Sequence, residues 1–382
     1  MDKKRIALFH PWIKSRGGAE KVVLEMLEKS KHKIDLYTWV YDKKNTFKEF
    51  EKYDIKVLTP KLGKKIARYH ILRGLFFPIS MFKKIPLKNY DRFLISTSGL
   101  AEFVVFRNHK KNKTYGYIYT PLREANRKIV RWNLKNRHQS KLSKLTYLSA
   151  VRVYRLFEKL AWRRFSKVMF ISNLSKSRGD EHKLNNNKEV VVLHAPVDFS
   201  RFEKLKGKDK GYFLYYSRLN PPKRQDLLII AWKKFVEKYP EKKLFIVGTP
   251  ENQEYYKKLL ELAKSTKNVE IRTDVGEKEL EDLVANAGVG MFLGYSEDFG
   301  IVPLEILAAG KPLIAVDEGG YVDLIKNHKG FHKIKEKHGR KEMIDEILKG
   351  LESFMAKKGK KGYKQKIKTQ EFIPNFDKFL EN

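Results

Sequence analysis

The fold is decided by residues 288–316, GVGMFLGYSEDFGIVPLEILAAGKPLIAV. The short apolar run at 288–293 predicts a buried strand. Residues 301–309 have helical spacing and are followed by Gly310, a residue type that commonly ends a helix. A second apolar run at 313–316 predicts another strand. The stretch therefore predicts a strand, a loop, a helix and a strand in succession, which is the repeating unit of a parallel α/β sheet.

Two carboxylates stand on the loop and the helix of this unit. Glu297 lies on the loop, and Glu305 lies on the predicted helix, about two helical turns further along the chain. Asp298, Phe299 and Gly300 follow the first carboxylate directly, and the glycine allows the backbone to bend tightly and come close to a ligand. The pattern indicates a ligand-binding loop. The alternative is two solvated acids at the ends of an ordinary βα unit.

The same alternation of strand and helix runs along the 382 residues and restarts in the middle of the chain. In the first half, apolar runs predict strands at 5–9, 34–37, 92–96, 115–119, 167–171 and 190–193. In the second half, the pattern predicts strands at 212–217, 244–247 and 269–272, with helices at 225–238, 252–265 and 278–286. Repeated βα units form parallel sheets covered by helices on both faces. Two Rossmann-like domains in series are therefore expected, with a break near 195–202.

Two further motifs follow predicted strands. Gly17 and Gly18 precede a predicted helix near 19–29, where backbone N–H groups can face an anion or a sugar at the positive helix end. The motif is neither the dinucleotide fingerprint nor the P-loop, so those ligands are not indicated. Arg218 and Lys223 follow the first strand of the second half. The alternatives are a plain tight turn for the glycines and a basic loop in a very basic protein for the two cations.

Together these motifs resemble those of the retaining family 4 glycosyltransferases, which have the GT-B fold. The resemblance implies an α/β protein with two Rossmann-like domains whose parallel sheets face each other across a deep cleft. It implies an acceptor-binding domain at 1–195, a nucleotide-sugar-binding domain at 196–355, and a segment at 356–382 that returns to the first domain. The donor would lie at the carboxyl ends of the strands.

The resemblance also implies roles for individual residues. Glu297 would contact the donor sugar, and Glu305 would hold the ribose hydroxyls, because a carboxylate can accept from two neighbouring hydroxyls. Arg218 and Lys223 would hold the donor diphosphate and stabilise its growing charge without a metal. Catalysis would thus rest on Glu297, Arg218 and Lys223, and Gly300 would join the nucleotide site. The cleft for the sugar and the acceptor would be lined by Gly17, Gly18, Tyr119, Glu297, Asp298, Phe299 and Gly300.

Residues 117–123, YIYTPLR, resemble a stretch of the bacterial and archaeal mannosyltransferase subgroup. In that subgroup a histidine faces the transferred sugar, whereas this chain has Tyr119 at the position. Tyrosine keeps a hydroxyl donor but cannot carry an imidazolium charge, so the orientation of the sugar is an open question. The resemblance makes GDP-mannose the expected donor and a UDP-sugar the second choice. No cofactor and no metal are expected. His10, at the end of the first strand, could contact substrate or be structural.

The formal net charge of +36 calls for an anionic partner. Residues 61–84 contain no acid, and between Phe103 and Phe157 the only acid is Glu124, against more than a dozen Lys and Arg. The run at 64–84 mixes basic and large apolar residues, as surface-lying membrane segments do, although a buried helix with a basic edge is the alternative. An anionic membrane surface and a glycan or lipid-linked acceptor are therefore the expected partners. The chain carries no helix-turn-helix, zinc-finger or RNA-recognition signature, so nucleic acid is not expected.

The remaining composition limits the cellular setting. The chain has no cysteine, which excludes disulfides and thiolate metal sites, and it has no run of eighteen apolar residues. The apolar run at 6–9 is too short for a signal peptide. We therefore expect a cytoplasmic protein that is peripheral at the cytoplasmic face of a membrane. Two other functions remain open: a sugar-nucleotide epimerase of the same fold, and a non-catalytic basic protein that binds nucleic acid or membranes.

Overall fold

The structure is a computed structural model that describes residues 3–59, 83–136, 140–357, 363 and 365–381. The chain divides into two compact units, Met1–Pro196 with Gln370–Asn382 and Val197–Thr369. The expected C-terminal segment 356–382 is therefore shared, since only its part from Gln370 onward groups with the first unit. Residues before Gln370 stay with the second unit, where the Gln365 carbonyl lies 3.1 Å from Nε2 of His328. The predicted surface segment 64–84 lies outside the described residues except for Lys83 and Lys84.

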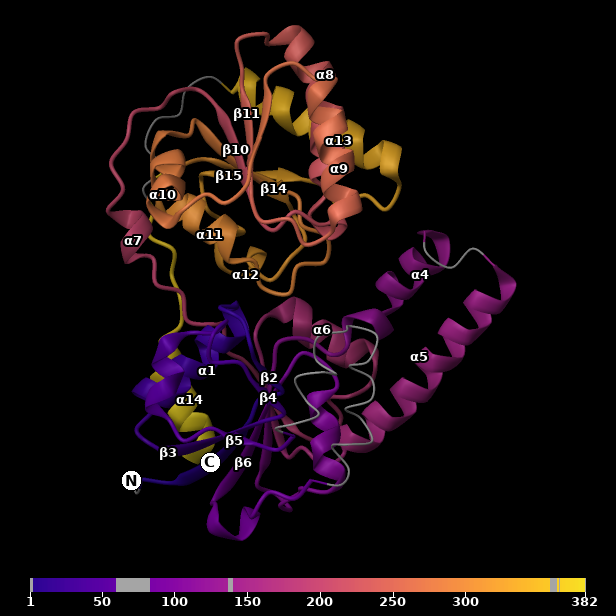
Figure 1. The fold of residues 1–382 in the computed structure, drawn as a ribbon, viewed down its shortest axis with the longest axis vertical. Coiled ribbons are helices and arrows are strands. Elements are labelled where there is room, and N and C mark those ends of the chain that lie inside the picture. The colour runs from indigo at the N-terminus through magenta and orange to yellow at the C-terminus, as the bar shows by residue number, and fades with distance from the viewer. Residues whose placement is uncertain (1–2, 60–82, 137–139, 358–362, 364, 382) are drawn as a thin grey trace. The chain divides into compact units, whose positions relative to one another are not determined.

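In its described part, the first unit contains a seven-stranded sheet in the order β5-β3-β1-β6-β7-β8-β9, in which all neighbours are parallel (Figure 1). Its strands are β1 (Arg5–Phe9), β3 (Lys33–Thr38), β5 (Lys56–Val57), β6 (Arg92–Thr97), β7 (Thr114–Ile118), β8 (Lys167–Phe170) and β9 (Glu189–Val192). The short strands β2 (Trp12–Ile13) and β4 (Val40–Tyr41) pair separately. The helices are α1 (Gly18–Lys29), α4 (Arg127–Asn136), α5 (Lys141–Trp162), α6 (Asn173–Glu181) and α14 (Phe372–Glu381). These strands confirm the six predicted for the first half.

Strand β7 shows how the sequence places helices on both faces of this sheet. Successive side chains of a strand point to opposite faces. Tyr115 and Tyr117 form edge-to-face contacts with Phe379 and Phe372 of α14. Ile118 belongs to the core on the other face, together with aromatic residues at the end of α5 and just after it. The C-terminal helix α14 is thus an integral layer of the first unit.

The second unit contains a six-stranded parallel sheet among its described residues, in the order β12-β11-β10-β13-β14-β15. The strands are β10 (Phe213–Tyr216), β11 (Leu244–Val247), β12 (Val269–Arg272), β13 (Val289–Phe292), β14 (Leu313–Val316) and β15 (Phe331–Ile334). The helices are α7 (Ser200–Glu203), α8 (Gln225–Lys238), α9 (Gln253–Lys264), α10 (Glu277–Asn286), α11 (Ile301–Ala308), α12 (Val322–Ile325) and α13 (Arg340–Ala356). The stretch that decides the fold is confirmed as β13, α11 and β14.

Helices cover both faces of this second sheet. Phe213 of β10 packs against Trp232 and Phe235 of α8, with ring centroids 5.1 and 5.6 Å apart. On the opposite face, α11 approaches β13 closely at Gly290, where an added Cβ would lie 2.6 Å from the side chain of Ile306. The glycine is needed here for the close approach of a helix to a strand. This contact fixes α11, and the predicted site residue that it carries, against the sheet.

The helices α4 and α5 of the first unit were not predicted. The basic stretch 103–157 contains α4 and most of α5, which form a hairpin that extends away from the sheet of the first unit (Figure 1). At the foot of α5, Tyr154 lies with its hydroxyl 2.7 Å from Glu102 and 3.2 Å from Glu158. Thr97 donates a further hydrogen bond to Glu102. Both carboxylates are 1% exposed, so burial and the neighbouring Glu158 raise the pKa of Glu102 to about 7.

We expect this pair to make the stability of the first unit fall with rising pH. The folded chain holds the Glu102 proton more tightly than the unfolded chain, so the contribution is complete below pH about 4.5 and is lost as the pH rises to about 7. The expected loss is on the order of 3 kcal/mol. Thermal unfolding between pH 4 and 8 should show a smaller decline for Glu102→Gln than for the wild type. Glu28→Gln, a change at an exposed site on α1, should keep the wild-type profile. Parallel profiles for all three proteins would contradict the expectation.

Candidate functional site

The predicted site residues of the second unit lie where the strand order of its sheet reverses. From β10 the chain proceeds to β11 and β12 on one side, and then to β13, β14 and β15 on the other. The loops that follow β10 and β13 leave adjacent strands at the same edge of the sheet. Open parallel sheets bind ligands at this switch point, beyond the carboxyl ends of the strands. Arg218 and Lys223 lie on the first loop, and Glu297 lies on the second.

Lys223 and Glu297 form the central contact of this site. The Lys223 ammonium donates to Oε2 of Glu297 at 2.5 Å, and the two side chains are 10% and 19% exposed. The ammonium also lies 5.0 Å from the centre of the Phe292 ring. The structure thus brings one predicted cation and one predicted acid together in a partly desolvated position. Such a pair has a fixed geometry and still faces solvent on one side.

Arg218 lies on the same loop but pairs with a different acid. Its guanidinium donates to Oε1 of Glu251 at 2.6 Å, and Asn220 donates to the other oxygen at 2.6 Å. Burial would raise the pKa of Glu251, but the hydrogen bonds from Asn220 and Arg218 outweigh it and hold the pKa below its usual value. The Arg218 side chain is 65% exposed. It is therefore free to change its partner at small cost, which the more buried Lys223 is not.

Glu305 is held beside the β10 loop by a tyrosine at the end of β10. The Tyr216 hydroxyl donates to Oε2 of Glu305 at 2.9 Å. Burial, together with the charge of Glu305, raises the pKa of Tyr216 well above its usual value, so the phenol remains a donor. Glu305 itself is half-buried on α11. Both predicted carboxylates of the motif therefore lie next to the loop that carries the predicted cations.

Gly300 is the one residue type that fits at the turn into α11. Its φ is +82°, and a Cβ there would lie 2.6 Å from Cδ1 of Tyr321. Tyr321 is anchored through its hydroxyl to the Val316 carbonyl at 2.5 Å. Of the other predicted loop residues, Phe299 is buried at 5% exposure and Asp298 is half-buried. Phe299 thus supports the loop from inside, whereas Asp298 lies closer to its surface.

Sequence reasoning missed the residues that hold the two loops in place. Arg224 has a φ of +58°, and its guanidinium donates two hydrogen bonds to Glu336 at 2.8 and 2.6 Å. The same guanidinium lies 4.5 Å from the centre of the Tyr295 ring. The Tyr215 hydroxyl donates to the Lys223 carbonyl at 2.5 Å. Arg224 and Glu336 are 112 residues apart, and nothing in the local sequence of either residue signals the pair.

In the first unit, Gly17 and Gly18 lie beyond β1, on one side of the switch point between β1 and β6, and Tyr119 lies beyond β7, the strand next to β6. Tyr119 follows β7 and is 7% exposed. Its hydroxyl accepts a hydrogen bond from Ser96 at 3.1 Å and donates to the Ala19 carbonyl in the first turn of α1 at 3.1 Å. Its proton is therefore committed to the backbone beside Gly17 and Gly18. The structure gives Tyr119 the role of holding this turn, since its only proton is directed at protein.

His10 completes this hydrogen-bonded chain. Nδ1 of His10 lies 3.0 Å from the Ser96 hydroxyl. Burial lowers the pKa of His10 to about 3, so the imidazole is neutral near pH 7. Gly17 caps the N-terminus of α1, and a Cβ at this position would lie 2.5 Å from Oε2 of Glu20. A larger residue at this position would therefore require the Glu20 carboxylate to shift.

Within the described ranges, no group of three or more His, Asp or Glu side chains is placed to hold a metal ion. No helix built from the described residues is long and apolar enough to cross a membrane.

The chain was compared with known proteins. Residues 196–365 match the family described as glycosyl transferases group 1. The chain is 24% identical over 378 residues to the alpha-1,3/1,6-mannosyltransferase ALG2 of Eremothecium gossypii, covering 85% of this chain and 71% of that protein. It is 22% identical over 377 residues to the GDP-Man:Man(3)GlcNAc(2)-PP-Dol alpha-1,2-mannosyltransferase of Dictyostelium discoideum, with coverage of 85% and 73%.

Solved structures show the same fold. Anabaena Alr3699/HepE in complex with UDP superposes with a TM-score of 0.60 at 15% identity, covering 99% of this chain and 98% of that one. The pneumococcal O-GlcNAc transferase GtfA in complex with UDP and GlcNAc superposes with a TM-score of 0.62 at 10% identity, with coverage of 100% and 99%. At these identities the likeness concerns the fold alone. The two parallel sheets, the loops at the switch point of the second sheet and the match over residues 196–365 agree with one another: the second unit carries a region of the glycosyl transferases group 1, and the chain is a glycosyltransferase.

Proposed function

We propose that this enzyme moves mannose from GDP-mannose to a glycan or lipid-linked acceptor, without a metal and with retention of the anomeric configuration. The observation that carries the proposal is the contact between Lys223 and Glu297, beside Glu305, at the switch point of the second sheet. A nucleotide sugar requires cations to bind its diphosphate and carboxylates to accept hydrogen bonds from its sugar hydroxyls, and this group of residues contains both.

The choice of mannose rests on the relatives. Two proteins that align over 85% of this chain are named mannosyltransferases, and one name specifies GDP-Man as the donor. A UDP-sugar is the second candidate, since structures of the same fold hold UDP. The name of one relative gives a dolichol-linked glycan as its acceptor. We therefore place a lipid-linked glycan first among the acceptor classes.

The second unit would stabilise the leaving group. As the bond between the anomeric carbon and the β-phosphate oxygen breaks, negative charge grows on the diphosphate. Lys223, held in place through its carbonyl and its partner Glu297, would direct its remaining ammonium protons at this charge without reorganising. Arg218 would leave Glu251 for the phosphate at small cost because it is exposed. Glu297 would accept from the sugar hydroxyls and Glu305 from the ribose.

The first unit would bind the acceptor. The hydroxyl oxygen of the acceptor would form the new bond to the anomeric carbon, on the face that the diphosphate leaves. The proton of that hydroxyl would pass to the departing phosphate oxygen. Gly17 and Gly18 would present the backbone to substrate, while Tyr119 holds their turn. The excess of basic residues in this unit supports association with an anionic membrane that carries the acceptor.

Transfer assays with GDP-mannose and UDP-sugars test the proposal. We expect mannose on a lipid-linked acceptor, an NMR-assigned anomeric configuration equal to that of the donor, and activity that EDTA does not reduce. Lys223→Ala should lower turnover by roughly 10²-fold or more, the size seen when one preorganised donor is lost. An inverted product, or activity that disappears with EDTA and returns with Mg²⁺, would overturn the mechanism. Epimerised sugar without transfer would instead identify an epimerase.

Glu305→Gln should weaken binding of the nucleoside diphosphate by about tenfold or more, because a charge-assisted hydrogen bond contributes about 1.5–3 kcal/mol. Isothermal calorimetry with GDP and with UDP measures the change, and circular dichroism checks the fold. Glu261→Gln is the matched control, since Glu261 is exposed on α9. Equal affinity in wild type and a folded Glu305→Gln protein would remove Glu305 from the ribose role.

The pair of Arg224 and Glu336 should couple energetically in the second unit. Their side chains are 13% and 7% exposed, so removing either partner leaves a poorly solvated charge. A double-mutant cycle with Arg224→Ala and Glu336→Ala should give a coupling energy of roughly 1–3 kcal/mol. Hydrogen exchange of β10 and β13 measures the unfolding free energies.

A second cycle serves as the control for this pair. Lys238 and Glu352 form an exposed pair at 3.2 Å, with side chains 61% and 40% exposed. Exposed pairs contribute about 0–1 kcal/mol, so this cycle should give a value near zero. Additive effects of the two changes at Arg224 and Glu336 would show that the pair does not hold the loop.

A further inference from the structure

Exposed apolar side chains are concentrated on one helix of the first unit. The large apolar side chains that stand out as exposed are Leu142 at 71%, Leu145 at 60%, Val153 at 56%, Leu156 at 59% and Leu260 at 42%. The first four lie on α5, and the fifth lies on α9 of the second unit. Single exposed leucines are common, but four on one helix form a patch that calls for a function.

The four side chains form one narrow stripe. At 100° per residue, Leu142, Leu145, Val153 and Leu156 fall within an arc of about 80°. They span about 21 Å along the helix axis at 1.5 Å per residue. We call these four residues the α5 stripe. The stripe is wide enough for one side of the helix to enter an apolar phase along nearly four turns.

The opposite face of α5 is already packed against the protein. Val151, Ala161 and Trp162 are buried. Arg155 donates to the Ala125 carbonyl, and the Tyr147 hydroxyl donates to the Glu124 carbonyl at 2.8 Å. The α5 stripe is therefore the side of an anchored helix that faces away from the first unit.

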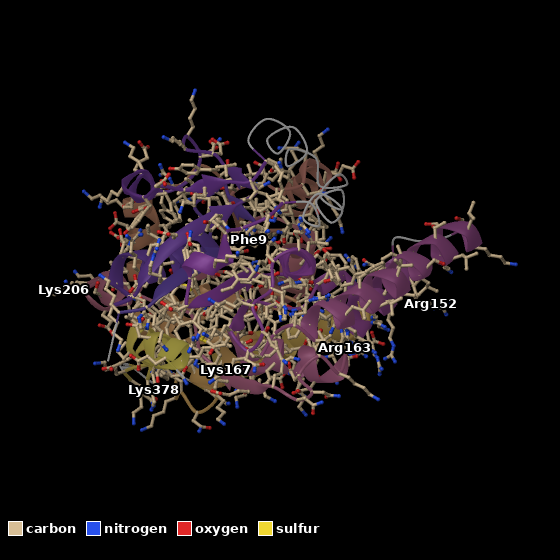
Figure 2. The ribbon with its side chains drawn as sticks, turned by 90° about the horizontal axis from the view of Figure 1, so that it is seen from below. Phe9, Arg152, Arg163, Lys167, Lys206 and Lys378 are labelled. Carbon is tan, nitrogen blue, oxygen red and sulfur yellow. The ribbon has the colours of Figure 1, made fainter. Side chains whose placement is uncertain are left out.

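Basic residues border the α5 stripe. Lys141, Arg152 and Lys159 are exposed on α5 and lie on one flank of the stripe. The only acid of this helix, Glu158, is 1% exposed and faces Tyr154 and His182 inside the unit. Figure 2 shows Arg152 on the part of the hairpin that extends outward and Arg163 at its foot. The outer surface of α5 thus combines leucines with unopposed positive charge.

From this combination we infer that the α5 stripe and its basic flank form a docking surface for an anionic lipid bilayer. A helix with an apolar stripe and a Lys- and Arg-rich border lies in the interface, with the apolar side chains among the acyl chains and the cations among the headgroups. A second copy of this chain fits poorly, because the same acid-free flank would face itself. Nucleic acid would engage the cations but would leave the leucines in water.

This inference rests on the proposed lipid-linked acceptor for its biological sense, but it makes a separate physical claim. Docking through α5 would hold the first unit at the membrane surface, so that a lipid-borne hydroxyl needs to rise only a short way to reach it. A soluble acceptor gains nothing from this docking. Loss of the α5 stripe should therefore separate the two kinds of acceptor.

Co-sedimentation of the full chain with vesicles tests the inference. Vesicles of phosphatidylcholine with 30% phosphatidylglycerol are the anionic probe, and pure phosphatidylcholine is the neutral one. We expect binding to the anionic vesicles alone, with release at 1 M salt. Leu145→Asn with Leu156→Asn should reduce the partition coefficient at least tenfold, whereas Leu260→Asn leaves it unchanged. Lys159→Glu with Arg152→Glu should reduce it similarly, and Lys257→Glu on α9, which is also exposed, serves as the charge control.

The outcomes are distinguishable from those of the transfer assay. The Leu145→Asn and Leu156→Asn protein should bind GDP normally and lose activity only on a vesicle-borne acceptor. Vesicle binding equal to wild type in this double variant overturns the inference. The inference is also overturned if sedimentation velocity shows a dimer that the same two changes dissociate. Tighter binding to RNA than to anionic vesicles at equal salt overturns it as well. Failure of donor binding in the wild type would instead remove the proposed function and leave the docking surface standing.

Discussion

The ion pair of Lys223 and Glu297 is the contact on which the second unit's site depends. It joins loops that leave two neighbouring strands, although the residues are 74 positions apart in the chain. A lysine that is 10% exposed has lost most of its hydration, and a nearby carboxylate compensates for that loss. The carboxylate can compensate for the lost hydration only if both loops keep their positions. Tyr215 holds the backbone of Lys223, and Gly300 lets the loop of Glu297 turn against Tyr321.

The two cations of the site have different surroundings and so suit different steps. Both are paired with an acid, so under the proposed function a diphosphate would enter the site by replacing those acids as the partner of the cations. Arg218, at 65% exposure, can swing between Glu251 and a ligand at little cost. Lys223 cannot move far, and its value is greatest where charge appears only in the transition state. Under the proposed function, this geometry would suit Arg218 to capture of the donor and Lys223 to the chemical step.

Much of this arrangement could be predicted from local sequence, because the signals were local. Short apolar runs predicted every strand from β1 to β14 except β2, β4 and β5, which are only two residues long. The helix α11 that follows the loop of Glu297 was also confirmed. Strand β15 and α13 were missed, since the run at 331–334 includes His332 and Lys333. The α4 and α5 hairpin was not predicted, because its many basic residues and its exposed leucines blur the usual pattern of one apolar and one polar helix face. Tyr119 could be located but not interpreted, since its role depends on a hydrogen bond to Ala19, 100 residues away.

The distribution of charge in this chain depends on which charged side chains reach water and which are paired inside the units. A net charge of +36 repels itself, and it is tolerated where cations point into solvent. Some acids have specific partners in the interior: Glu297 and Glu336 pair with cations of the site, while Glu102 and Glu158 lie inside the first unit. The surface of α5 is left with cations and leucines. An anionic bilayer, as proposed for α5, would satisfy both at once, whereas water satisfies only the cations.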